Sequence, residues 1–202
     1  RYAQYFKGEF DFRYFYNAND RNGFVLRAYA GLGTPRKNAV ALPFEKSFFS
    51  GGSNGIRAWQ ARTLGPGGYR DARYPVTFNN IGEIKLEGNF EYRFKLTPLF
   101  NLALFADVGN IWLIHPDPNR PKADFELTRF ADEIAIGGGL GFRLDFDFFL
   151  VRLDMGMQLK DPAKIEGERW LWQPKLEYLS YLASTGSTIE RVPLRQSMVF
   201  NL

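Results

Sequence analysis

One segment of this 202-residue chain has the spacing of a hydrolase nucleophile. Residues 51–55 read Gly-Gly-Ser-Asn-Gly and fit G-x-S-x-G, a motif in which a strand leads into the serine and a helix follows it. Here Ser53 lies in a glycine-rich stretch with no helical period after it. The single histidine, His115, is the only candidate base, and it lies in a proline-rich segment. We therefore interpret residues 51–55 as a loop and keep an outer-membrane lipid hydrolase only as the second alternative.

The other candidate patterns indicate neither a cofactor nor a metal. The glycines of residues 137–141 lack the spacing and the following helix of a dinucleotide-binding motif. The chain has no cysteine, which removes thiolate ligands and thiol nucleophiles. Acidic residues between positions 117 and 133 lack the regular spacing of a calcium loop, and they are Asp117, Asp124, Glu126, Asp132 and Glu133. A solvated acidic loop is the simpler interpretation, so we expect no cofactor and no metal.

A short arginine motif stands in the longest segment that lacks a strand pattern. It consists of Ile56, Arg57, Ala58 and Trp59. An arginine between large apolar side chains, after a flexible glycine run, suits a loop that folds back and buries its tip. A buried guanidinium needs a carboxylate, ideally a bidentate one, and the strands that follow offer Glu91 and Asp107. A surface arginine beside a packed tryptophan would have the same spacing.

The elements that must position these residues are strands. Apolar and polar side chains alternate with a period of two along most of the chain, which is typical of β-structure. Between positions 83 and 95, for example, the odd residues are charged or polar and the even residues are apolar or glycine. Similar segments cover residues 9–16, 24–33, 83–95, 99–114, 134–146, 149–159 and 195–202. The sequence therefore predicts an all-β chain of about seven antiparallel strands.

The composition of the two strand faces favours a membrane barrel over a soluble sheet. Aromatic residues make up 17% of the chain and concentrate on the apolar face, while the other face carries mixed charges and glycine. A soluble sheet also alternates, but an aromatic exterior around a charged, hydrated interior is typical of a transmembrane β-barrel. The net charge of +4 is small and evenly mixed with acids, so nucleic acid is not an expected partner.

The lengths of the connections give a second, independent indication of a barrel. Short connections at about 17–23, 96–99 and 145–148 alternate with long ones at about 34–81, 115–132 and 161–194. Outer-membrane barrels have short periplasmic turns and long extracellular loops. Trp112 lies at the long-loop end of its strand, where we predict an aromatic-girdle position.

Three of these segments resemble motifs of the BamA/TamA superfamily, also called the bacterial surface antigen family. Residues 56–59 resemble its V/I-R-G-F/W motif in the sixth extracellular loop, with Ala58 where glycine is commoner. Residues 105–112 resemble its F-x-D-x-G-x-V/I-W strand, and residues 199–202 its closing strand. The continuation at residues 60–68 resembles TamA-like members more than BamA itself.

The resemblance implies a fold and a set of site residues. Residues 1–202 would be the C-terminal half, about seven to eight antiparallel strands, of a sixteen-stranded transmembrane β-barrel with a long extracellular loop folded inward. Upstream strands and periplasmic repeat domains would lie outside this chain. Arg57 would enter the lumen and meet Glu91 and Asp107. The closing seam strand would comprise Ser197, Met198, Val199, Phe200, Asn201 and Leu202.

The resemblance also implies a non-enzymatic factor that assembles, inserts or translocates proteins at the bacterial outer membrane. Such a barrel opens at a lateral seam, where client strands add to the exposed edge by β-augmentation. The implied partners are outer-membrane lipid, client outer-membrane proteins, and periplasmic or inner-membrane accessory proteins. A passive porin-like or adhesin-like barrel is the first alternative. It would need an open lumen, whereas a hydrolase would need Ser53 near His115.

Overall fold

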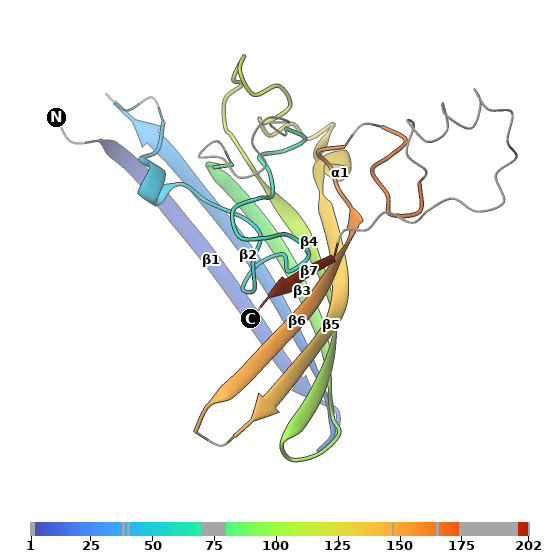
Figure 1. The fold of residues 1–202 in the computed structure, drawn as a ribbon. Coiled ribbons are helices and arrows are strands. Elements are labelled where there is room, and N and C mark those ends of the chain that lie inside the picture. The colour runs from blue at the N-terminus through green and yellow to red at the C-terminus, as the bar shows by residue number, and fades with distance from the viewer. Residues whose placement is uncertain are drawn as a thin grey trace, which may run out of the picture.

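The computed structural model describes residues 3–37, 39, 41–69, 80–146, 148–164, 166–173 and 198–201, which form one curved, open sheet (Figure 1). Within these residues the sheet has seven antiparallel strands in chain order. They are β1 (Gln4–Asn17), β2 (Asn22–Arg36), β3 (Ile84–Lys95), β4 (Phe100–Trp112), β5 (Ala135–Asp145), β6 (Leu150–Lys160) and β7 (Met198–Asn201). The predicted all-β class is confirmed, and every strand overlaps a segment predicted from the alternation.

Two short helices accompany the strands in the described part of the chain. The 3-10 helix η1 spans Phe44–Lys46, and the α-helix α1 spans Phe130–Glu133. No helix in the described ranges is long and apolar enough to cross a bilayer.

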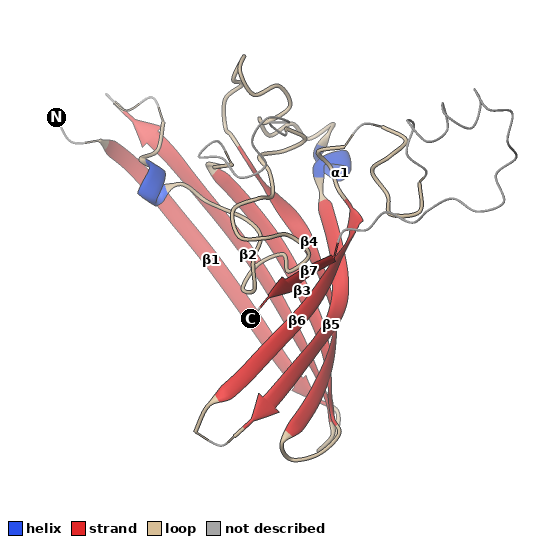
Figure 2. Cartoon of the chain, viewed as in Figure 1, coloured by secondary structure: helices blue, strands red, loops and turns tan. Residues whose placement is uncertain are grey.

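Connections of two lengths lie at opposite ends of the sheet (Figure 2). The short ones join β1 to β2, β3 to β4 and β5 to β6 at one end. In the first of these, the Asn19 side-chain oxygen accepts hydrogen bonds from the backbone N–H groups of Arg21 and Asn22 at 2.9 and 2.8 Å. In the second, the Thr97 hydroxyl oxygen accepts from the Phe100 backbone N–H at 3.0 Å. In these two connections, side-chain oxygens accept hydrogen bonds from backbone N–H groups at the point where the chain reverses.

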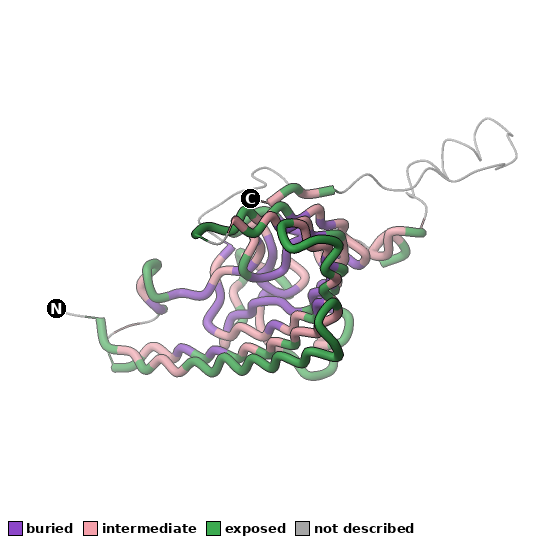
Figure 3. Tube along the Cα trace, turned by 90° about the horizontal axis from the view of Figure 1, so that it is seen from below, coloured by how far each residue is buried: buried purple, intermediate pink, exposed green. Residues whose placement is uncertain are grey.

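The two faces of the sheet differ as the alternation predicts. Even-numbered aromatic side chains of β1 are exposed on one face, among them Phe10, Phe12 and Tyr14. The register continues this face across Ala28, Gly88 and Val108. The other face carries Glu87, Glu91 and Asp107, all buried, because the segment between β2 and β3 folds against it (Figure 3). The concave face therefore holds the charged groups, and the convex face is the apolar one.

The prediction that Trp112 belongs to an aromatic girdle is wrong. Trp112 is fully buried at the end of β4, and its ring packs against Phe125 and Phe130. Its Nε1–H donates a 2.8 Å hydrogen bond to the carboxylate of Glu133 in α1. A buried indole N–H needs such a partner, and the connection between β4 and β5 supplies both the partner and the cover. Strand alternation carries no information about this covering segment.

The Trp112–Glu133 contact leads to a prediction about pH. Burial raises the pKa of Glu133 above its ordinary value of 4.5, although hydrogen bonds from Trp112 and Arg129 act against the rise. With 5-fluorotryptophan incorporated, we expect the ¹⁹F resonance of Trp112 to titrate with a midpoint above 4.5. The Glu133→Gln variant should abolish that titration, because glutamine keeps an acceptor for the indole but cannot ionise. A midpoint at or below the ordinary glutamate value would contradict the predicted direction.

Candidate functional site: an arginine-anchored loop

The segment between β2 and β3, residues 37–83, forms the anchored loop of this protein. Its tip, residues 53–59, reaches the middle of the concave face (Figures 1 and 3). Gly51 and Gly52 adopt positive φ values of 95° and 88°, which glycine tolerates. A 2.7 Å hydrogen bond from the Gly52 N–H to the Trp59 carbonyl then closes the tip. The glycine run therefore shapes a tight turn rather than a catalytic elbow.

A small apolar cluster holds the tip in place. Its members are all buried, and they are Ile56, Ala58, Trp59, Leu64 and Ala135. The first four belong to the anchored loop and Ala135 opens β5. Burial of the Ile56 and Leu64 side chains alone contributes a few kcal/mol, at about 1.5–3 kcal/mol for each. Three of the four motif residues thus pack, which leaves Arg57 to make the polar contacts.

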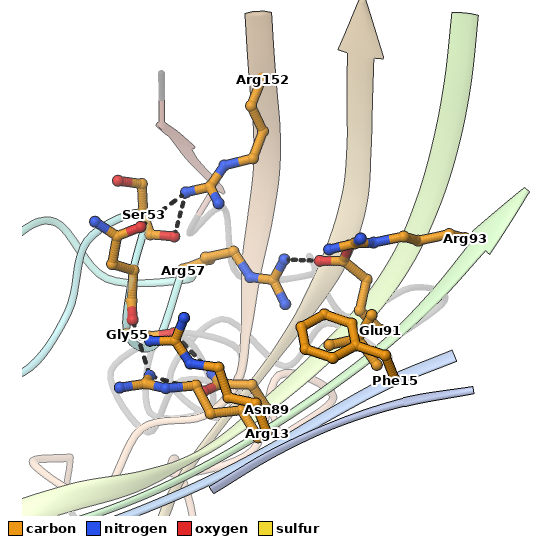
Figure 4. Close-up of a pocket in the computed structure, with 12 residues that line it drawn as sticks. Arg13, Phe15, Ser53, Gly55, Arg57, Asn89, Glu91, Arg93 and Arg152 are labelled. Carbon is orange, nitrogen blue, oxygen red and sulfur yellow. Dashed lines mark hydrogen bonds and ion pairs between the residues drawn. The ribbon is translucent and has the colours of Figure 1, made fainter. Parts of the chain in front are cut away.

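All three guanidinium nitrogens of Arg57 donate hydrogen bonds to two carboxylates. Its Nε and Nη2 donate to the two oxygens of Asp107 at 2.9 and 2.8 Å, and its Nη1 donates to Glu91 at 2.6 Å (Figure 4). Its backbone N–H also donates to Asp107 at 2.9 Å. The guanidinium lies 3.7 Å above the ring centre of Phe105. The bidentate fork and the ring contact are both specific to arginine.

The two acids that the sequence offered to Arg57 are therefore the two that it contacts. Glu91 comes from β3 and Asp107 from β4. Asn89 also joins these elements, because its amide donates to Asp107 at 2.9 Å and to the Gly55 carbonyl at 2.8 Å. The functional role of the motif stays a prediction.

Sequence reasoning missed two members of the network. Arg143 of β5 donates to both oxygens of Glu91 at 2.9 Å. Asp154 of β6 is fully buried and faces Arg152, Arg143 and Arg57 at 3.2, 3.3 and 3.9 Å. Alternation places Arg143 and Asp154 on the concave face, but it does not show which strand positions the loop tip contacts. Those positions depend on the strand register and on the path of the loop.

Two glycines allow the tip to lie directly on the sheet. A Cβ at Gly137 in β5 would be 2.5 Å from the Cβ of Ala58. A Cβ at Gly156 in β6 would be 2.6 Å from the Arg57 carbonyl oxygen and 2.9 Å from the backbone of Ala58. These strand glycines thus make room for the loop backbone.

The short last strand also touches the tip. β7 pairs with residues 154–157 of β6, and the side-chain amide of Asn201 donates a 2.7 Å hydrogen bond to the Arg57 carbonyl. Of the predicted seam residues, Met198, Val199, Phe200 and Asn201 are described, whereas Ser197 and Leu202 lie outside the described residues. Together with the 3.0 Å hydrogen bond from Arg27 of β2 to the Asn54 carbonyl, the anchored loop thus contacts β2, β3, β4, β6 and β7 through polar groups.

The two candidate residues of a hydrolase lie apart. Ser53 lines a cavity on the concave face, while His115 lines a different one between the anchored loop and the β4–β5 connection. The Ser53 carbonyl accepts a 2.6 Å hydrogen bond from Arg152.

The acids of residues 117–133 pair with arginines. Asp117 pairs with Arg120, Asp132 lies 3.7 Å from Arg169, and the other three pair with Arg129. No group of metal-ligating side chains gathers in the described part of the chain.

The chain is similar to known proteins in its sequence and in its fold. A family model described as the Omp85 superfamily domain matches residues 2–173. Curated proteins gave no match. Among solved structures, BamA from Haemophilus ducreyi lacking POTRA domains 1-3 superposes with a TM-score of 0.61 at 13% sequence identity. The match covers 83% of this chain and 33% of that one, so this chain spans about a third of its length and shares its barrel fold.

These comparisons do not separate a TamA-like from a BamA-like member, and that preference stays a prediction. The seven-stranded sheet is open, as a part of a larger barrel must be. The Omp85 superfamily domain covers most of the described strands. The chain therefore belongs to the Omp85 superfamily and is part of a bacterial outer-membrane protein.

Proposed function

We propose that residues 1–202 form the C-terminal part of the barrel of an outer-membrane protein assembly, insertion or translocation factor. Family membership and the barrel fold support this role in general terms. The observation that carries it is the arginine-anchored loop tip, because it joins the middle of the sheet to the short last strand through Asn201. This arrangement positions a loop and needs no cofactor.

The proposed mechanism rests on the number of residues over which each strand is paired. β1 to β6 each have 11 or more residues, whereas the described residues of β7 pair with β6 over four positions. Within the described residues few ladder hydrogen bonds join β7 to β6, and this edge is where the proposed mechanism opens the sheet. Client outer-membrane strands would add at this seam by β-augmentation, with lipid alongside and accessory proteins delivering the client. Asn201 and Arg57 would set how readily β7 separates.

The alternatives explain the interior less well. A passive porin-like or adhesin-like barrel has no need for a loop tip tied to five strands across the space through which solutes would pass. A hydrolase needs a base beside its serine, and Ser53 and His115 line separate cavities. A non-enzymatic role is therefore the proposal that the geometry supports best.

The proposed function is tested with the full-length protein in proteoliposomes. Urea-unfolded outer-membrane client is added, and its folding is followed by the shift of folded barrels on unheated gels. We expect faster client folding than in empty liposomes, with little ion conductance. Conductance without any acceleration of client folding would identify a passive barrel and overturn the proposal.

A variant at Asn201 tests the link between the loop and the seam. Asn201→Ala removes one half-buried hydrogen bond to the Arg57 carbonyl, which is worth about 1 kcal/mol. We expect faster deuterium exchange in residues 198–201 and an altered rate of client folding. Met198→Leu is the matched control, because Met198 is exposed in the same strand. Equal exchange in Asn201→Ala and wild type would show that the contact does not hold β7.

A further inference from the structure

A cavity of about 470 Å³ lies on the concave face beside the loop tip (Figure 4). Five arginines line it, and they are Arg13, Arg27, Arg57, Arg93 and Arg152. Glu91 is the one acid among its lining residues. The strand positions of Arg13 and Arg93 place the cavity between the loop tip and the short turns, which is the periplasmic side of such a barrel.

The charged groups around the cavity differ in how far they are exposed to solvent. The acids Glu91, Asp107 and Asp154 are buried, and Asp11, which pairs with Arg13 and Arg27, is 31% exposed. By contrast, the side chains of Arg13 and Arg93 are 58% and 45% exposed. A ligand entering from the turn side therefore meets these two guanidiniums first, although much of the positive charge is balanced by Asp11 and by the buried acids. Such a surface attracts anions and repels cations.

Two of the arginines keep unused donors toward this space. Arg93 pairs with Glu91 through Nε at 2.6 Å, and its terminal amino groups contact no acceptor in the described residues. Arg13 uses Nε and Nη2 on Asp11, which leaves its Nη1 without a partner in the same ranges. A guanidinium with a free edge matches the geometry of a carboxylate.

An apolar pair stands beside these donors. Phe15 and Val25 lie opposite each other on β1 and β2, and both line the cavity. They are apolar where the next concave positions of the same strands carry Arg13 and Arg27. Phe15 is exposed, so an apolar side chain of a ligand could cover it. The cavity thus offers a carboxylate site and an apolar contact within one short stretch of strand.

We infer that this cavity binds an acidic segment of an unfolded client polypeptide on its way to the seam. An extended peptide can present a carboxylate and an apolar side chain at neighbouring positions, as the two kinds of contact require. A lipid phosphate is the less suitable ligand, because the apolar face that acyl chains cover is the convex one. The inference rests on the proposed function and names the feature of the client that is recognised.

The test uses the full-length protein in detergent and a fluorescent peptide of about nine residues, the length of a membrane strand, in which glutamate alternates with valine. A matched peptide has glutamine in place of glutamate. We expect the wild-type protein to bind the glutamate peptide about tenfold more tightly, from charge-assisted hydrogen bonds to the guanidiniums. Added salt should reduce that preference.

The variants locate the site. Arg13→Gln combined with Arg93→Gln should lose the roughly tenfold preference and leave binding of the glutamine peptide unchanged. Arg36→Gln is the control, since it makes the same kind of substitution, with the loss of one positive charge, at an exposed position at the other end of β2. Equal binding of both peptides to wild type, or an equal loss in the control, would overturn the inference. So would displacement of the peptide by inorganic phosphate at matched concentration.

Failure of this test is distinguishable from failure of the proposed function. Peptide anisotropy needs no client folding, so absent binding alongside accelerated client folding would reject only the acidic-segment site. Peptide binding by a protein that does not accelerate client folding would reject only the assembly role.

Discussion

Arg57→Ala is expected to release the loop tip from the sheet while leaving the barrel folded. The substitution removes the one cation that pairs with the buried Asp107 among the described residues, whereas Glu91 keeps Arg143 and Arg93. Breaking a buried pair in this way costs roughly 3–5 kcal/mol. We therefore expect deuterium exchange in residues 50–64 to rise by about a hundredfold or more, and client folding to slow with it.

Two further variants make the Arg57 result specific. Arg57→Lys should restore only part of the protection, because an ammonium cannot form the fork with Asp107. Arg62→Ala should have little effect, since Arg62 is exposed in the same loop. Its guanidinium lies 4.3 Å from the Phe49 ring centre and is not part of the Arg57 network. The shift of the folded barrel on unheated gels reports whether the strands stay paired. Full protection of residues 50–64 in Arg57→Ala would show that the carboxylate contacts do not hold the loop.

Gly156→Ala is expected to displace the same tip without touching a charge. The added Cβ would meet the Arg57 carbonyl oxygen at 2.6 Å and the Ala58 backbone at 2.9 Å, and backbone atoms cannot move aside as a flexible side chain can. Overpacking of this kind costs about 1–3 kcal/mol. Exchange in residues 50–64 should rise, and the Arg57–Asp107 fork should lengthen in a structure of the variant.

Gly138→Ala is the matched control for Gly156→Ala. Gly138 pairs with Met157 on the neighbouring strand, but a Cβ there would face the Phe105 carbonyl at 3.3 Å and Leu159 at 3.4 Å, away from the loop. We expect near-normal protection of the anchored loop in this variant. If both glycine variants loosen the loop equally, the cause is general strain in β5 and β6 rather than contact with the tip.

The sequence predicted the strands because alternation is a local property. In β3, for example, the residue types alone show which side chains share a face. They therefore place Glu91 on the concave face and Phe90 on the convex face. The carboxylate partners of Arg57 were within reach of the same reasoning, with the family resemblance narrowing the choice. The role of these residues in assembly is still untested.

Other features could not be read from the sequence because they depend on where distant segments meet. Alternation gives the face of Arg143 and Asp154, but their contact with the tip depends on the strand register and on how far the loop descends. Trp112 is covered by residues that follow it by more than ten positions, so its exposure is a property of the β4–β5 connection. The Asn201 contact spans 144 positions and has no local signature.

The same long spacing determines when the loop can close during the folding of this protein itself. Apart from β2, whose Arg27 donates to the Asn54 carbonyl, the strands that hold the loop tip follow it in the chain, from Glu91 34 positions later to Asn201 144 positions later. Contacts of such high contact order form slowly, because the chain between them must be ordered first. Locking of the arginine is thus a late folding step, and a newly made barrel passes through an unlocked stage in which the loop is open to proteases.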